Sequence, residues 1–445
     1  MKEIICVFRT VTPLFMEGAD PYGKPELRAP SFKSAMRYWY RALDPHYKAN
    51  ESKIFGSTDE GRGELFSLRI NGEIEGKTGT WNNDNFDKLT RPNPNCPFKP
   101  VPSKWNVNGI RYLAYGLDEK VRGVRQQRSY ISPHIDIKIT LGFRQTPRIE
   151  TKKAIIASLW LLGHIGGLGS RSRRGFGTTS LQPWTCSWDE CSQMPVAHGS
   201  ITAEKWFEIF KKGIETLKSW YPGNSVPDHT VLFGDNMNFC LCSEGESARG
   251  VNGNPFDAWQ LALNEAGYKM QSFRQRQDFQ DPNSDYKRVK EHLTSLDPKV
   301  AAANTKIDRN QLTHAPDRAR FGLPLTIRYG SMRYPRVKSD GKPLLNSRNR
   351  QIYHVPETTF SGPDKDHDRS ASPIHIRVVE IAGKCHPFFI RLDAPLVPSD
   401  TKIREEYKNE EKNITLNHHY IPTDRLLNEF WTHIETAGDF VWVEV

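Results

Sequence analysis

The stretch from 163 to 177 combines glycine and arginine in a pattern that suits phosphate groups. It holds six glycines and three arginines in fifteen residues. Glycine allows another backbone to approach closely, and backbone N–H and guanidinium groups are donors that phosphate oxygens accept from. We therefore expect this stretch, the Gly-Arg loop, to contact a phosphodiester strand. The expected contact residues are Gly166, Gly167, Gly169, Ser170, Arg171, Ser172, Arg173, Arg174 and Gly175.

The Gly-Arg loop does not have the pattern of a nucleotide-binding loop. GxxxxGK[ST] is absent, and the glycines follow an expected helix instead of joining a strand to a helix. A structural interpretation is that the glycines only let a helix and a sheet pack closely. That interpretation leaves Arg171, Arg173 and Arg174 without a role, so binding of a polyanion is favoured.

A second basic element is a helix expected from 31 to 43, with Pro30 or Ser31 at its start. At 100° per residue, Lys33, Arg37 and Arg41 share one face, and apolar residues cover the other. Like charges at this spacing repel one another, so a polyanion is the natural partner. The alternative is a solvated face whose long side chains lie along apolar surface.

The whole chain is basic. Its 62 Lys and Arg exceed its 52 Asp and Glu by ten, and its pI is near 9.1. Nucleic acid is the leading class of partner, and an anionic membrane surface comes second. The longest apolar run, 154 to 163, is half of the roughly 20 residues that span a bilayer. The first residues meet a charge too soon for a secretory signal. We expect a cytoplasmic protein with no membrane partner.

Two further basic groups occur along the chain. Nine Lys or Arg and a single acid, Asp340, lie between 318 and 350. Aromatic residues in or beside this region could stack on bases, although core packing is the more frequent role of tyrosine. These residues are Tyr329, Tyr334 and Tyr353, and the smaller basic group is Arg122, Arg125 and Arg128.

The seven cysteines are an odd and sparse set for 445 residues, which favours reduced thiols over a disulfide framework. Two pairs, Cys186 with Cys191 and Cys240 with Cys242, lack the CxxC spacing of zinc sites. We expect no metal and no cofactor.

Length and pattern predict two or three domains of the α+β class. Strict alternation from 135 to 143 predicts a half-buried strand, and the apolar spacing predicts helices at 151 to 165 and 203 to 220. Strands and helices mix without a regular βαβ alternation. We divide the chain into domains at 1–195 and 196–445. Three segments rich in Pro, Gly, Asn or charges are expected as exposed loop insertions, at 77 to 109, 334 to 372 and 398 to 423.

Four motifs in the first 180 residues resemble the repeat-associated mysterious protein (RAMP) superfamily. In chain order they are TPLFM at 12–16, ELRAPSFKSAMRYWYRAL at 26–43, IFGST at 54–58 and the Gly-Arg loop. More narrowly, they resemble the two-domain, first-numbered subunits of type III-B CRISPR Cmr effector complexes. The sequence DRSASP at 368–373 resembles the C-terminal half of those subunits more weakly.

This resemblance implies two ferredoxin-like, RRM-related RAMP domains with long loop insertions. It also implies a ribonucleoprotein that uses CRISPR guide RNA to capture complementary target RNA in antiviral defence. Such a subunit binds near the 3′ end of the guide, beside other RAMP subunits, and cleavage belongs to other subunits. By matched motif, the RNA contacts would be Arg28, Lys33, Arg37 and Arg41 with the loop from 166 to 177.

Two alternatives remain beside this RNA-binding interpretation. One is a metal-independent RAMP endoribonuclease, with His164 as general acid or base on the 2′-hydroxyl and the leaving oxygen. A single histidine at a buried helix end is more often structural, and the sequence places no partner beside it. We therefore expect no catalytic residue. The other alternative is an architectural subunit that contacts only proteins.

Overall fold

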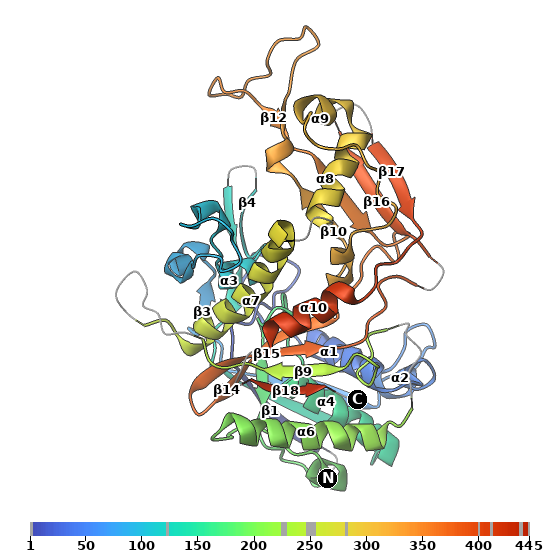
Figure 1. Cartoon of the computed structure of the whole chain (residues 1–445). Coiled ribbons are helices and arrows are strands. Elements are labelled where there is room, and N and C mark those ends of the chain that lie inside the picture. Colours follow the sequence, from blue (N-terminus) through green and yellow to red (C-terminus); the bar gives the residue numbers. More distant parts are fainter. Residues whose placement is uncertain are drawn as a thin grey trace.

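The computed structural model describes residues 3–121, 124–223, 229–245, 255–280, 284–398, 401–409, 413–435 and 439–443. Helices and strands are mixed throughout, as the sequence predicts (Figure 1). Within these ranges no helix is both long and apolar enough to cross a membrane.

The first sheet has four antiparallel strands in the order β2-β7-β1-β8. Its strands are β1 (Glu3–Thr10), β2 (Phe66–Asn71), β7 (Asp136–Phe143) and β8 (Thr179–Leu181). Helix α1 (Ala29–Leu43) follows β1, and α4 (Ile149–His164) joins β7 to β8. Burial alternates along β7, which confirms the predicted strand. Both predicted helices of this half are confirmed within two residues at each end.

The second sheet repeats this arrangement with the order β14-β15-β9-β18. Its strands are β9 (Asn238–Leu241), β14 (Ile374–Ile381), β15 (Lys384–Arg391) and β18 (Phe440–Val443). Helix α7 (Ala258–Gln280) follows the first of these strands, and α10 (Arg425–Ile434) precedes the last. Both sheets therefore carry the element order β-α-β-β-α-β with the same order of strands.

A third sheet, β10-β13-β16-β17, is built from two separate insertions into the second half. It comprises β10 (Leu325–Arg328), β13 (Glu357–Ser361), β16 (Ile403–Lys408) and β17 (Asn413–His418), with helices α8 (Asp285–Leu296) and α9 (Pro298–Ala303) nearby (Figure 1). The expectation of loops at 334 to 372 and 398 to 423 is therefore wrong in part. Both segments were predicted as loops because they are rich in turn-forming or charged residues. In the structure, Phe360 and Ile403 from these segments are fully buried and pack in one core.

The segment from 77 to 109 is also not a simple exposed loop. It contains β3 (Thr78–Thr80), which pairs with β6 (Ser129–Ile131), and two short 3-10 helices, Asn83–Leu89 and Ser103–Trp105. Trp81 and Phe86 are buried and stack with ring centroids 4.7 Å apart. These two aromatic residues supply a local core that the many prolines and asparagines concealed. Helix α3 (Gly109–Leu113) and the antiparallel strands β4 (Asp118–Val121) and β5 (Val124–Gln127) lie between β3 and β6 in the chain.

Helix α6 (Ala203–Trp220), predicted from its apolar spacing, connects the two halves. Its Phe210 ring stacks on Trp160 of α4 at 5.7 Å and meets Phe239 of β9 edge-on at 5.0 Å. The predicted boundary after residue 195 lies between α5 (Asp189–Gln193) and this helix. Cys186 and Cys191, at α5, form a disulfide, so the expectation of reduced thiols is wrong for this pair.

Candidate nucleic-acid interface

The Gly-Arg loop lies between the first matched motif and the second sheet. The backbone N–H groups of Ser170 and Gly177 donate to the carbonyls of Phe15 and Pro13, each at 2.8 Å. On its other side, the N–H of Ile376 in β14 donates to the carbonyl of Arg173 at 3.0 Å. The loop is therefore held at the junction of the two sheets.

Several glycines of the loop are required by its own packing. Gly169, Gly175 and Gly177 have positive φ values of 72°, 83° and 60°. A Cβ on Gly169 would lie 2.2 Å from the carbonyl oxygen of Phe15, and one on Gly166 would lie 2.3 Å from the indole nitrogen of Trp39. The structural interpretation accounts for these glycines, because only glycine tolerates such approaches and such φ values. It does not account for the arginines.

The three arginines of the loop are half-buried and lack an acidic partner. Among the described residues, no carboxylate lies within ion-pair distance of Arg171, Arg173 or Arg174. Burial lowers the pKa of Arg171 and of Arg174, in each case as the largest effect. The charge of Glu119 acts on Arg171 from beyond ion-pair distance and offsets part of this effect. Partly desolvated guanidinium groups without an ion-paired carboxylate gain from a bound anion.

Helix α1 presents its three basic residues on one face, but acids from elsewhere pair with all three. Lys33 contacts Glu64, and the Nε atoms of Arg37 and Arg41 each lie 2.5 Å from an oxygen of Glu51 in α2 (Tyr47–Phe55). Burial raises the pKa of Glu51, yet hydrogen bonds from Arg41 and Arg37 hold it below its usual value. The expectation of a free cationic face is therefore wrong, because these acids belong to other segments and the spacing within one helix carries no information about them.

Arg28 and Ser170 also have partners within the chain. The Nε of Arg28 lies 3.1 Å from Glu26, and Arg28 keeps 41% of its side chain exposed. Arg128 pairs with the buried Glu17 at 2.7 Å and donates to the hydroxyl of Ser170 at 3.1 Å. Of the same small basic group, Arg125 pairs with Asp84 and Asp118, and Arg122 lies outside the described residues.

Two of the predicted contact elements meet around Tyr38 of α1. The guanidinium of Arg173 lies 5.0 Å from the centre of the Tyr38 ring, and the centre of the His229 ring lies 5.2 Å from it. Burial lowers the pKa of His229, and the charges of Arg41 and Arg173 lower it further. The structure therefore places Arg41 and Arg173 near one aromatic cluster. Tyr38 and His229 were not predicted, because nothing in their spacing separates them from core residues.

His164 is held as a structural residue at the end of α4. It is 3% exposed, and burial lowers its pKa to about 3. Its Nδ1 donates to the carbonyl of Trp160 at 2.9 Å, and its Nε2 accepts from the N–H of Ala197 at 3.2 Å. Both ring nitrogens are used, which leaves neither of them facing a substrate.

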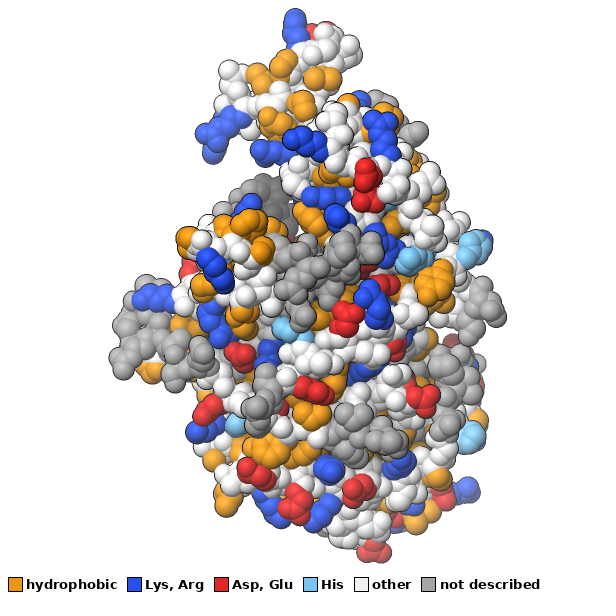
Figure 2. All heavy atoms as spheres, viewed as in Figure 1, with side chains coloured by type: hydrophobic (Ala, Val, Ile, Leu, Met, Phe, Trp, Pro, Cys, Tyr) orange, Lys and Arg blue, Asp and Glu red, His pale blue; other side chains and the backbone are white. Residues whose placement is uncertain are grey.

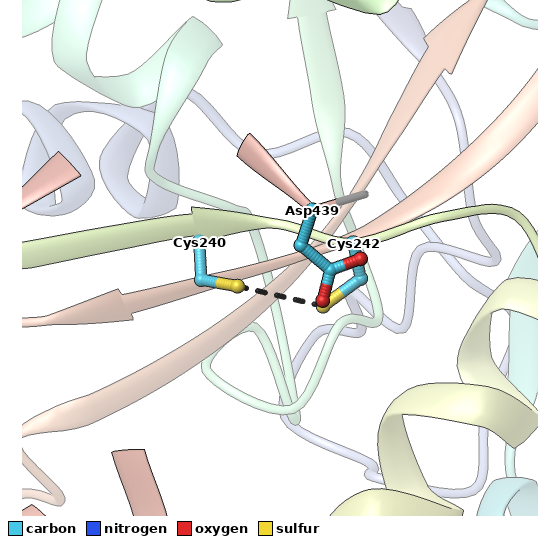
Figure 3. A group of neighbouring side chains, drawn as sticks. All are labelled: Cys240, Cys242 and Asp439. Atoms are coloured by element: carbon cyan, nitrogen blue, oxygen red, sulfur yellow. Dashed lines mark hydrogen bonds between the residues drawn. The ribbon is translucent and has the colours of Figure 1, made fainter. Parts of the chain in front are cut away.

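Cys240 of β9 and Cys242, which directly follows this strand, lie beside Asp439, and these three residues form a group of possible metal ligands (Figure 3). Their sulfur atoms lie 3.7 Å apart. Metal binding needs thiolates, but the hydrogen bond to Cys240 and burial raise the pKa of Cys242 well above its usual value. The Asp439 carboxylate already accepts from the N–H of Ser243 at 3.0 Å. The arrangement favours packing of neutral thiols, and the absence of a metal stays a prediction.

Comparison with known proteins identifies the class of this chain. The RAMP superfamily model matches residues 7–180, the part that carries the first sheet and the Gly-Arg loop. The CRISPR system Cmr subunit Cmr1-2 of Pyrococcus furiosus is 30% identical over 196 residues, which are 41% of this chain and 96% of that protein. The first half of the chain therefore places it among the RAMP proteins.

More narrowly, the chain belongs to the Cmr1 family of RAMP proteins. Cmr subunit Cmr1-1 of the same organism is 26% identical over 166 residues, which are 35% of this chain and only 41% of that protein. The crystal structure of apo Cmr1 from P. furiosus superposes with a TM-score of 0.51 and 15% identity, covering 99% of this chain and 98% of the other. That superposition supports a shared fold.

Proposed function

We propose that this chain is an RNA-binding, noncatalytic subunit of a type III-B CRISPR effector complex. It contacts guide RNA near its 3′ end and helps to capture complementary target RNA in antiviral defence, beside other RAMP subunits. Backbone contacts supply affinity, while pairing between guide and target supplies sequence specificity. Membership of the Cmr1 family supports this assignment.

The main observation in favour of RNA binding is that Arg171, Arg173 and Arg174 form no ion pair within the described ranges. These guanidinium groups are half-buried at the junction of two sheets and have no carboxylate partner in the described part of the chain. The repeated β-α-β-β-α-β order supports two ferredoxin-like, RRM-related domains, a class of fold that many RNA-binding proteins use.

Replacing the three arginines with glutamine is expected to weaken binding of single-stranded RNA by the full-length chain. The slope of log affinity against log salt should flatten by up to about two units, at about 0.7 per lost phosphate contact. Glutamine keeps much of the length of each side chain, and a melting curve checks that the variant is folded. A filter-binding titration at several salt concentrations measures the slope.

The matched control removes three arginines that already pair with acids. Arg69, Arg111 and Arg328 contact Glu3, Asp87 and Glu357, so their replacement by glutamine lowers the net charge equally. We expect the control slope to stay close to that of the parent. Equal slopes for the parent and the loop variant would exclude the loop and favour a purely architectural subunit.

The purified chain is expected to leave labelled RNA intact in EDTA, because both nitrogens of His164 are used within the protein. Denaturing gels after prolonged incubation test this expectation. Guide-length products that disappear in His164→Gln would instead favour the ribonuclease. Glutamine can supply a donor and an acceptor, so this variant separates catalysis from loss of folding.

A further inference from the structure

Residues 333–353 form an arm that projects from the third sheet at the end of the molecule opposite α6 (Figure 1). At its base, β11 (Tyr334–Pro335) pairs with β12 (Tyr353–His354). Backbone hydrogen bonds continue outward, from Arg336 N to Ile352 O at 2.9 Å and from Leu344 N to Arg336 O at 2.9 Å. Two turns, 338–342 and 346–350, form its tips. Each turn is closed by a backbone hydrogen bond, of 2.8 Å and 2.9 Å respectively.

The arm is ordered by its backbone and buries few side chains. Every residue from 335 to 350 except Leu344 is exposed. Even its apolar residues Val337 and Leu345 are 49% and 42% exposed. Apolar burial is the usual reason for a chain to keep such an extension folded back on itself. Here the side chains remain available to a partner.

The charge of the arm is almost entirely positive. It carries six Lys or Arg and one acid, Asp340, which lies 3.5 Å from Lys342. Lys338, Arg348 and Arg350 form no ion pair with any residue that the structure describes. Figure 2 shows basic side chains at the ends of the arm. This is the reverse of α1, where Glu51 and Glu64 neutralise the basic face.

We propose that the arm is a second RNA-binding element, which contacts ribose-phosphate backbone separately from the Gly-Arg loop. Lysines and arginines at both turns provide phosphate donors. At the base, the guanidinium of Arg333 lies 4.7 Å over the ring of Tyr353, which is 43% exposed. Such an aromatic and guanidinium pair offers a surface on which an unpaired base can stack. Tyr329 and Tyr334 are buried and serve the core.

The composition of the turns favours RNA over a membrane surface. Elements that bind a bilayer place Trp, Phe or Leu beside their basic residues, so that an apolar face enters the headgroup region. The turns 338–342 and 346–350 contain only Lys, Arg, Ser, Asn, Asp and Gly. The turns themselves can attract phosphate and offer no apolar side chain to lipid. The flanking Val337 and Leu345 are 49% and 42% exposed, and neither is the Trp or Phe that such elements use.

The test neutralises four tip residues together, with Lys338→Gln, Lys342→Gln, Arg348→Gln and Arg350→Gln. In the full-length chain, the slope of log affinity for single-stranded RNA against log salt should flatten by about two to three units, at about 0.7 per lost contact. Affinity near 0.1 M salt should fall by roughly tenfold or more. All four positions are exposed, so the fold should be unaffected.

The matched control neutralises four lysines of α6, Lys205, Lys211, Lys212 and Lys218, which removes the same charge from the opposite end of the molecule. An equal loss of affinity in both variants, or no loss in the arm variant, would overturn the proposal. Binding to phosphatidylserine vesicles that depends on the arm, with an unchanged RNA slope, would assign the arm to a membrane instead.

The arm variant and the Gly-Arg loop variant separate this inference from the proposed function of the loop. Because the elements occupy different parts of the molecule, their effects on the slope should add in the combined variant. If only the loop variant is impaired, the arm proposal fails and the loop proposal stands. If only the arm variant is impaired, the reverse holds.

Discussion

Arg377→Leu is expected to lower the free energy of unfolding by about 3 kcal/mol or more, because it leaves several buried carbonyl groups without donors. Arg377 lies in β14 and is 3% exposed. Its guanidinium donates to the carbonyls of Leu162, Gly163, Gly166 and Thr179, at the end of α4 and the start of β8. It therefore ties the second sheet to the first through unpaired carbonyls of a helix end.

The charge of Arg377 has no acidic partner among these contacts, and burial lowers its pKa to about 9. It stays protonated at neutral pH, where the negative end of the α4 dipole stabilises it. Leucine fills similar space but offers no hydrogen. Lysine keeps the charge but has fewer donors in a different geometry. We therefore expect the free energy of unfolding of Arg377→Lys to lie between that of the parent and that of the leucine variant.

Urea unfolding of Arg377→Leu and of Arg369→Leu makes a matched comparison. The Arg369 side chain is 82% exposed, so its replacement should change stability by less than about 0.5 kcal/mol. Similar stabilities for the two leucine variants would show that the carbonyl cluster contributes nothing. A loss confined to Arg377→Leu, together with weaker RNA binding, would also connect the sheet junction to the Gly-Arg loop.

Arg377 illustrates which features the sequence can predict. The run from 374 to 381 predicts a strand because its apolar residues are dense, and β14 occupies those residues. The burial of its one arginine depends on carbonyls about two hundred positions away, at Gly163 and Gly166. Local periodicity carries no information about such partners. Strand order, which arises from the same long-range pairings, was equally beyond prediction.

The candidate site shows the same division between local and distant effects. The Gly-Arg loop was located from its composition, and the first helix from its spacing. The pairing of Arg37 and Arg41 with Glu51 was missed, because this acid lies on a different helix. Conversely, the sequence predicts the basic region near 340 from its charge and from neighbouring tyrosines that could stack on bases. Only the fold shows that the turns of this region are exposed, whereas the basic residues of α1 are neutralised by acids from other segments.

Stability is expected to fall as the pH drops from 7 to 5, and His375→Phe should remove part of that fall. Burial lowers the pKa of His375 to about 3, with a smaller contribution from Arg173, and burial lowers that of His164 to about 3. In the unfolded chain both titrate near 6.5. Between about pH 3 and 6.5, the unfolded chain thus binds more protons, so stability is full above this window and is lost as the pH falls through it.

At pH 5 each of these histidines should cost about 2 kcal/mol of stability relative to neutral pH. His375 is the better one to replace, because its Nε2 has no hydrogen-bond partner and its ring stacks with Tyr38 and meets Trp39 edge-on. Phenylalanine keeps both ring contacts and cannot be protonated. Urea unfolding should show stabilities within about 1 kcal/mol at pH 7, and a variant more stable than the parent by about 2 kcal/mol at pH 5. Parallel curves for the two proteins between pH 7 and 5 would contradict a neutral, buried His375 and would place its ring in contact with water.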